Sequence, residues 1–358
     1  MSNSELGELA MTDEIIYFPN IVGNGSLIRR LSRDIAENRL SHAYILEGAR
    51  GSGRHTLALN AIAAIECSAR GEHTAHSPIP CGRCKSCEKI LSGKSPDVIT
   101  IGLAEDRATI GVDAVRALKD DIYTAPNDLS IKAYIIEDAD LMTAQAQNAF
   151  LLSLEEPPSY IVFFLICENS ANLLETVRSR APTLRTQRSS PEELEKYLLK
   201  NDSRAAELKS TSPEEWEELI CAAQGSIGNG LDLLDAKKRA RLLEYRRVAK
   251  SIISMLGRSD KVAALEVVST LGLKRAEVCR QLSFVQCALR DLLLLKKCET
   301  APLCFFERRD EAIELSTNFT AHTLLSLYDA SIMATDDLET NSNVRLTLMS
   351  MMQNAGLI

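Results

Sequence analysis

The sequence predicts an α/β domain with a parallel β-sheet, followed by a part of the chain that is helical throughout. Short apolar segments near residues 43, 98, 133, 162 and 183 alternate with segments of helical periodicity, which is typical of a parallel sheet covered on both faces. A glycine-rich turn follows the first of these segments and opens a helix, in the order strand, loop, helix. Beyond about residue 190, Leu and Ala recur at helical spacing.

The individual elements follow from the same patterns. Apolar residues at helical spacing from Leu27 onward predict a helix that ends near Asn38, directly before the first strand. The glycine turn opens a helix that should run to about Cys67. The later segments predict strands at 97–101, 132–140 and 161–166 and helices at 112–123, 141–154 and 173–177.

The composition is that of a globular chain with more than one domain. Its 358 residues are 45% hydrophobic and 25% charged, and this length accommodates two or three domains. No run of eighteen apolar residues occurs, and the first ten residues are acidic where a signal peptide would be basic. We therefore expect a cytoplasmic protein without a membrane segment. The formal net charge of -8 argues against a chain that coats nucleic acid by itself.

The glycine-rich turn resembles a phosphate-binding loop with altered chemistry. Gly48 and Gly53 match the glycines of G-x-x-x-x-G-K-[ST], but Arg54 and His55 stand where the lysine and the hydroxyl belong. Arg54 keeps a positive charge on a planar fork, whereas an imidazole is a poor substitute for the hard oxygen ligand of Mg²⁺. Thr56 lies about 100° further around the helix and does not simply replace that hydroxyl. We expect a loop that no longer hydrolyses nucleotide, and weak binding of ATP and Mg²⁺ stays open.

Two acids form the other half of this candidate nucleotide site. Residues 132–140 read K-A-Y-I-I-E-D-A-D, an apolar strand that ends where a metal-associated Asp and a catalytic Glu are typical. The order is reversed, because Glu137 precedes Asp138. The exchange moves each carboxylate by roughly 1.5 Å, which reaction geometry tolerates poorly. The alternative, that these acids only solvate the strand end, stays open. The candidate nucleotide-binding residues are Gly48, Gly51, Gly53, Arg54, Thr56, Glu137 and Asp138.

Four of the ten cysteines have the spacing of metal ligands. Cys67 is followed by thirteen residues and then by C-G-R-C-K-S-C. Such spacing is typical of a tetrahedral Zn²⁺ site, and the polar residues between the cysteines argue against an apolar core. A fourth thiolate closes the coordination sphere, so the zinc should be structural. His73 or His76 could replace one cysteine. The predicted ligands are Cys67, Cys81, Cys84 and Cys87.

The C-terminal part should form two helical domains. We expect the sheet domain at residues 1–186, with the zinc module at 67–87, a small helical domain at 187–236, and a larger one at 237–358. Trp216 is expected to be a packing anchor in the small domain. The basic stretch 237–241 reads K-K-R-A-R, which is more typical of a solvated helix face than of a DNA contact.

Several of these motifs together resemble bacterial DNA polymerase III clamp-loader subunits. They are N-R-L-S-H-A-Y-I-L-E-G at 38–48, the four-cysteine insertion, N-A-F-L-L-S-L-E-E-P at 148–157 and S-R-A at 179–181. The resemblance spans the first 230 residues and continues more weakly to N-S-N-V-R-L at 341–346. Within the family the chain is more similar to the delta-prime type than to the ATP-hydrolysing gamma/tau type. The altered loop, the exchanged acids and Gly228, which stands where active subunits have a sensor arginine, favour this choice.

The resemblance implies an AAA+ module, a helical lid and an all-α collar that joins five subunits. Arg180 matches the arginine of the family's S-R-C motif, which points into the neighbouring subunit's nucleotide site, whereas Ala181 replaces the cysteine of that motif. A guanidinium supplied in trans can stabilise charge on a transferring γ-phosphoryl group. Arg178 is a weaker candidate for this role. The implied partners are gamma/tau and delta subunits and, through the assembly, the sliding clamp and primer-template DNA.

The sequence can be interpreted in terms of three functions. The first is a delta-prime-like subunit of the DNA polymerase III holoenzyme that has no ATPase activity of its own and supplies Arg180 as an arginine finger. The second is a gamma/tau-like ATPase that works with Arg54, Thr56, Glu137 and Asp138. The third, a generic nucleic-acid-binding scaffold, is opposed by the acidic charge and by the lack of interleaved basic and aromatic residues.

Overall fold

The computed structural model describes residues 18, 21–71, 79–104, 107, 109–258, 261–340 and 342–356. The chain divides into two compact units. The first contains the described residues up to Leu194 together with Ser226–Gly228, and the second contains Glu195–Gly225 and the described residues from Asn229 onward. The finer division of the helical part at residue 236 stays a prediction.

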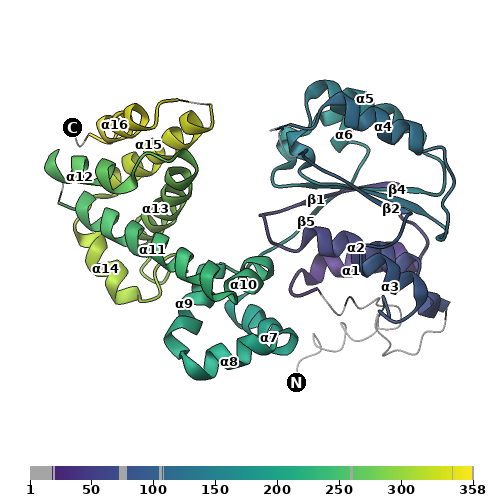
Figure 1. Ribbon diagram of the computed structural model, residues 1–358, viewed down its shortest axis with the longest axis horizontal. Helices are drawn as coiled ribbons and strands as arrows, with labels where there is room; N and C mark the ends of the chain where they lie inside the picture. The colour runs from purple at the N-terminus through teal and green to yellow at the C-terminus, as the bar shows by residue number, and fades with distance from the viewer. Residues whose placement is uncertain are drawn as a thin grey trace, which may run out of the picture. The chain divides into compact units, whose positions relative to one another are not determined.

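The first unit is built on a five-stranded parallel sheet (Figure 1). Its strand order is β2-β3-β4-β1-β5, so that β1 lies between β4 and β5. Because all strands are parallel, the carboxyl ends of β1, β3 and β4 meet at one edge of the sheet. The predicted α/β fold class is confirmed. The strands are β1 (Ala43–Glu47), β2 (Val98–Ile101), β3 (Lys132–Ile136), β4 (Ile161–Cys167) and β5 (Thr183–Arg185).

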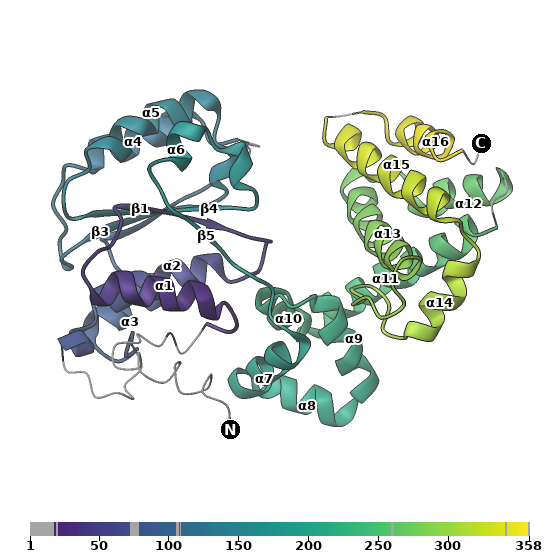
Figure 2. The ribbon, with the colours of Figure 1, turned by 180° about the vertical axis from the view of Figure 1, so that it is seen from behind.

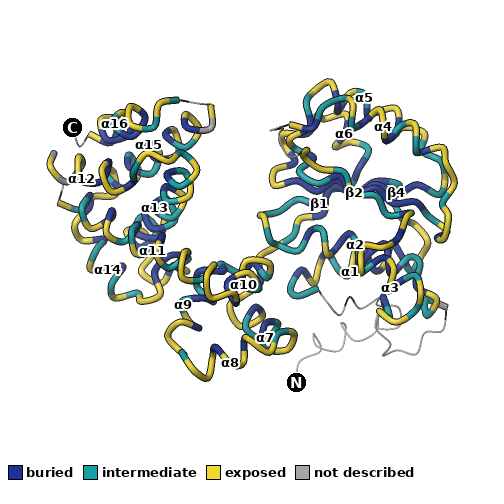
Figure 3. The backbone as a smooth tube through the Cα atoms, viewed as in Figure 1, coloured by how far each residue is buried: buried dark blue, intermediate teal, exposed yellow. Residues whose placement is uncertain are grey.

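Helices cover both faces of this sheet, as Figures 1 and 2 show from opposite sides. Alternate side chains of β1 point to opposite faces, so that Tyr44 packs in one core cluster and Ile45 in the other. β1, β3 and β4 are buried almost throughout (Figure 3), which explains their continuous apolar sequences. One face carries α1 (Gly25–Ala36), α2 (Arg54–Ile65) and α3 (Lys85–Leu91), and the other carries α4 (Val112–Asp121), α5 (Ala144–Glu155) and α6 (Glu175–Arg178).

Short 3₁₀ helices and caps define the ends of several elements. The predicted helix at 141–154 begins later than expected, because Thr143 Oγ1 accepts a hydrogen bond from Ala146 N at 3.2 Å and caps α5 at Ala144. The residues before it form a separate 3₁₀ turn. The 3₁₀ helices are η1 (Ser68–Gly71), η2 (Ala139–Leu141) and η3 (Ser170–Asn172).

The regular elements described in the second unit are all helices. Its main core is formed by apolar side chains between residues 249 and 355, mostly Leu, Ile, Val and Ala from helices, together with Phe and Met. Trp216 is 3% exposed, and its indole N–H donates to Glu195 Oε1 at 3.1 Å. No helix in the described ranges is long and apolar enough to cross a bilayer. The helices from residue 191 onward are α7 (Pro191–Asn201), α8 (Ser203–Thr211), α9 (Pro213–Ala223), α10 (Ile227–Leu233), α11 (Ala236–Leu256), α12 (Lys261–Leu271), α13 (Arg275–Leu295), α14 (Arg309–Thr317), α15 (Ala321–Glu339) and α16 (Val344–Asn354).

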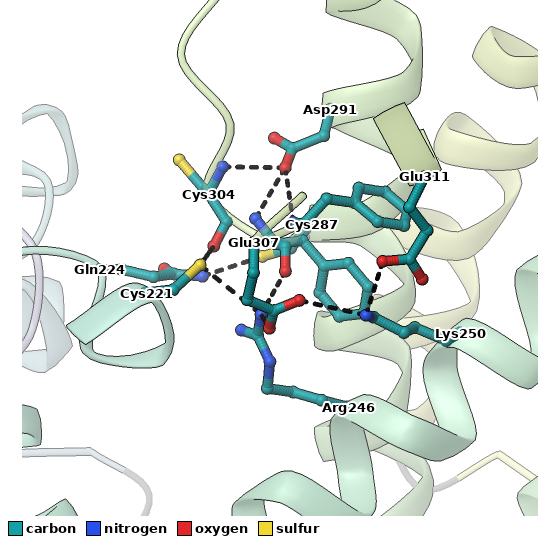
Figure 4. A network of polar contacts seen from close by, with 11 residues as sticks. Cys221, Gln224, Arg246, Lys250, Cys287, Asp291, Cys304, Glu307 and Glu311 are labelled. Atoms are coloured by element: carbon teal, nitrogen blue, oxygen red, sulfur yellow. Dashed lines mark hydrogen bonds and ion pairs between the residues drawn. The ribbon is translucent and has the colours of Figure 1, made fainter. Parts of the chain in front are cut away.

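A buried polar network fastens the segment before α14 to α11 and α13 (Figure 4). Asp291 is fully buried and accepts backbone N–H groups of Cys304 and Phe305 at 2.8 and 2.7 Å. Arg246, which is 3% exposed, pairs with Glu307. Basic residues of α11 thus serve packing inside the second unit. The stretch 237–241 behaves similarly at one position, since Arg239 Nε lies 3.0 Å from Glu215 Oε2.

Candidate functional site

The four predicted zinc ligands lie together at the end of α2 and the start of α3. The sulfur atoms of Cys67, Cys81, Cys84 and Cys87 are all within 4.8 Å of one another. A tetrahedral site with Zn–S bonds of about 2.3 Å places its sulfurs roughly 3.8 Å apart, so the cluster fits zinc after a small contraction. The Cys84 sulfur caps α3 by accepting the N–H of Cys87 at 3.5 Å. His73 and His76 lie outside the described residues.

The environment of these thiols differs from one to the next. Burial raises the pKa of Cys67 and of Cys87. Burial also opposes ionisation of Cys84, but N–H and side-chain hydrogen bonds from Cys87 and Ser68 outweigh it and lower its pKa to about 6. Zinc binds thiolates, so a metal entering this site would displace protons from the buried pair. Cys87 is fully buried within the core cluster of one sheet face, and the metal would thereby tie α3 to the sheet domain.

The glycine loop follows β1 at the edge of the sheet and contains two glycines in the left-handed region. Gly51 and Gly53 have φ angles of 77° and 83°, which favour glycine over residues with a Cβ. A larger residue would not fit at position 48, because a Cβ on Gly48 would lie 2.0 Å from Thr186 Oγ1. Ser52 Oγ and Thr186 Oγ1 are 2.7 Å apart. The loop therefore packs closely against the end of β5.

Arg54 opens α2 and points into the protein rather than into solvent. It is 7% exposed, and its Nη1 atom has no hydrogen-bond partner among the described residues. Burial and nearby carboxylates raise the pKa of Cys167 to about 12, and the charge of Arg54 acts in the opposite direction. The guanidinium thus lies near the carboxyl end of β4, below the loop. The N-cap position of α2 has no side-chain hydrogen bond and its first turn has no acidic residue.

The positions that would hold Mg²⁺ contact each other directly. His55 Nδ1 is within hydrogen-bond distance of Glu137 Oε1, and the two side chains are 43% and 29% exposed. Asp138 starts η2 with a left-handed φ of 47°. Thr56 is exposed on α2. The structure therefore brings Glu137 to the loop, but its partner is an imidazole and not a hydroxyl.

Ser226 and Gln147 are two polar residues that the sequence pattern does not single out, and they hold the loop and the segment before α6, respectively. Ser226 Oγ donates to Gly51 O at 3.0 Å, and a Cβ on Gly228 would lie 3.6 Å from Gly51 Cα. The turn before α10 consequently covers the loop. Gln147 is 3% exposed and joins α5 to the segment before α6, since its Oε1 accepts Leu174 N at 2.7 Å. A glutamine on an otherwise apolar helix face was the available signal.

Arg180 follows α6 and is held by two neighbouring elements. Its Nη2 lies 2.6 Å from Glu155 Oε1, and its Nη1 donates to Thr176 O at 2.9 Å. The side chain is 34% exposed. Ala181, which replaces the cysteine expected from the resemblance, is 1% exposed and packs in the core beneath α5. The missing cysteine therefore leaves a small residue in a buried position.

The parallel sheet with helices on both faces, the glycine loop after β1 and the acids after β3 have the arrangement of a nucleoside-triphosphatase fold. Residues 23–190 match the model of a family described as DNA polymerase III, delta subunit. The tau subunit of DNA polymerase III from Bacillus subtilis is 29% identical over 300 residues, which cover 80% of this chain and 51% of that protein. The delta' subunit from the same organism is 34% identical over 176 residues, covering 49% of this chain and 51% of that protein.

The chain is therefore similar to bacterial DNA polymerase III subunits of both the tau and the delta' type, and residues 23–190 carry the family match. It spans about half the length of each of the two relatives. Among solved structures, a gamma subunit-related protein of DNA polymerase III from Thermotoga maritima is similar at a TM-score of 0.42 and 20% identity, covering 91% of this chain and 98% of that chain. Because both tau and delta' relatives match, the type of subunit needs a separate argument.

Proposed function

We propose that this chain is a non-hydrolysing, delta-prime-like subunit of the DNA polymerase III clamp loader. It would hold a structural zinc with its four cysteines, associate with gamma/tau and delta subunits through its C-terminal helices, and supply Arg180 to the nucleotide site of a neighbouring ATPase. Its contribution to loading the sliding clamp on primed DNA would be mechanical and regulatory. The expected cytoplasmic location belongs to the same proposal.

The contact between His55 and Glu137 carries the proposal. In a working site the hydroxyl after the loop lysine and a carboxylate after the strand hold Mg²⁺ beside the phosphates. Here the corresponding carboxylate is engaged by an imidazole, which is not a hard oxygen ligand. The exchanged order of Glu137 and Asp138 and the glycine at 228 also argue against ATP hydrolysis by this chain. A metal-dependent hydrolysis step lacks its usual ligands.

One observation keeps the competing function, a gamma/tau-like ATPase, in view. The Nη1 atom of Arg54 is buried without a partner, and an unpaired buried guanidinium is costly unless an anion binds there. A phosphate of bound nucleotide would satisfy it. Binding alone is compatible with both functions, so turnover must decide between them.

Titration of the purified chain with labelled ATP and Mg²⁺ tests the two functions. The proposal expects no turnover above background, whether or not nucleotide binds. Hydrolysis at a rate typical of clamp-loader ATPases would overturn it in favour of the gamma/tau-like function.

The trans role of Arg180 is tested in an assembly reconstituted with the other clamp-loader subunits of the same organism. Arg180→Ala should lower ATP hydrolysis by about 10³-fold at the neighbouring site, the lower range for an arginine finger. Arg178→Ala, two residues away on an exposed position, is the matched control and should leave the rate unchanged. Equal rates for the two variants would remove the assignment of Arg180.

A further inference from the structure

Arg180 forms an ion pair with an acidic residue of another helix. Glu155 is the last residue of α5, and its Oε1 lies 2.6 Å from Arg180 Nη2. The other terminal nitrogen, Nη1, donates to Thr176 O at 2.9 Å and lies 3.5 Å from Ser179 Oγ. The guanidinium is thus held on two sides, by the end of α5 and by α6.

The two elements that hold the guanidinium are themselves joined by a buried side chain. Gln147 lies on α5 and is only 3% exposed, although glutamine is rarely fully buried in folded proteins. Its Nε2 donates to Asn172 O at 3.3 Å, and its Oε1 accepts Leu174 N at 2.7 Å. α5 and the segment that leads to Arg180 therefore form one hydrogen-bonded body. These bonds join the start of α5 to the segment before α6, and the ion pair with Arg180 joins the end of α5 to the residues after α6.

The contacts leave the guanidinium able to act on a ligand. An arginine side chain carries five N–H donors, and the contacts with Glu155, Thr176 and Ser179 leave N–H groups on Nε and Nη2 for a phosphate oxygen. Arg180 remains 34% exposed and Glu155 45% exposed. Solvent at this degree of exposure weakens the Coulomb attraction of the pair, so the carboxylate fixes the direction of the guanidinium without cancelling its charge.

We infer that Glu155 is a positioning residue for Arg180, holding the guanidinium in the orientation in which it meets the neighbouring subunit's γ-phosphate. The inference rests on the proposed trans role of Arg180. A long, exposed arginine samples many rotamers, and catalysis by a charged group falls steeply when that group is displaced by about 1 Å. Two anchors, one of them charged, select one orientation before the neighbour arrives.

The test measures kcat and KM for ATP in the reconstituted clamp-loader assembly. Glu155→Ala should lower kcat about tenfold, less than the loss for Arg180→Ala, while the KM for ATP changes by less than about twofold, because positioning affects the transition state more than substrate binding. Glu155→Gln keeps an acceptor oxygen and should recover part of the rate. Glu156→Ala, a change at the neighbouring exposed acid, is the matched control and should match the wild type.

A double variant separates positioning from a general structural effect. In the Arg180→Ala background, Glu155→Ala should cause no further loss, since the group that it positions is gone. An equal additional loss in that background, a kcat for Glu155→Ala equal to that of Glu156→Ala, or a higher kcat would each overturn the inference. If Arg180→Ala itself has no effect, the proposed function fails first. Thermal unfolding of each purified variant checks folding, and Glu155→Gln carries the test if Glu155→Ala is unstable.

Discussion

Loss of the proposed zinc from the cluster of four cysteines should destabilise the first unit of this protein. Bound zinc stabilises the folded state by RT ln(1 + [Zn]/Kd), which is about 4 kcal/mol when free zinc is a thousandfold above Kd. For a unit of roughly 200 residues, each kcal/mol shifts the melting temperature by about 2–4 °C. Removal of zinc by a chelator is therefore expected to lower the melting temperature of this unit by about 8–16 °C, measured by calorimetry. Cys87→Ser should have a similar effect, because Cys87 is fully buried and is one of the four proposed ligands.

Metal analysis and a matched cysteine variant test the zinc assignment directly. Mass spectrometry should find about one zinc per wild-type chain and much less for Cys87→Ser. Cys298→Ser, a change at an exposed cysteine of the second unit, should alter neither the zinc content nor the transition. A metal-free wild-type protein with an unshifted transition would refute the zinc assignment, and an equal effect of Cys298→Ser would refute the reasoning from burial and ligation.

Two further predictions concern the scaffold of the sheet domain. Burial opposes ionisation of Asp97, but backbone N–H groups of residues 127–129 outweigh it and lower its pKa. Asp97→Asn should therefore lower the free energy of unfolding by about 1.5–3 kcal/mol at neutral pH. A group with a depressed folded pKa stabilises above its unfolded pKa and loses this contribution as pH falls through the folded pKa. Urea titrations should thus find that the difference in unfolding free energy between wild type and Asp97→Asn becomes smaller below about pH 4. A difference that does not change with pH would contradict the role given to the Asp97 carboxylate. Asp113→Asn, a change at an exposed acid, is the control. Gly48→Ala should cost about 1–3 kcal/mol, because its Cβ would meet Thr186 Oγ1 at 2.0 Å. Thr186→Ala should restore part of the loss, and equal stability of Gly48→Ala and wild type in the same titrations would disprove the clash.

Local patterns were sufficient to predict much of the fold. The parallel sheet follows from apolar runs that alternate with helices, and the grouping of the four cysteines follows from the spacing of Cys81, Cys84 and Cys87 within one short segment. The start of α5 was placed too early because Leu141 extends the apolar pattern, whereas the cap at Thr143 decides where the helix begins. Caps of this kind compete with hydrophobic periodicity and are easily overlooked in a single sequence.

The contacts that give the candidate nucleotide site its character could not be predicted in this way. His55 and Glu137 are separated by 82 positions, and Ser226 and Gly51 by 175. No local signal reports such pairs, because they depend on the order of the strands and on the return of the chain over the loop. The sequence identified altered residues at the loop, but their mutual contacts required the three-dimensional structure.

Those long-range contacts also bear on why the fold would persist after its chemistry is lost. In a working site, nucleotide and Mg²⁺ satisfy the loop, the helix start and the strand-end carboxylate. Here Ser226 donates to the loop, Thr186 packs against Gly48, and His55 engages Glu137. Interactions within the chain take the place of ligand contacts at the loop and at the carboxylate, whereas Arg54 at the start of α2 keeps an unpaired Nη1. Selection on such a subunit would then act on the surfaces it presents to its neighbours, which is where the proposed function places Arg180.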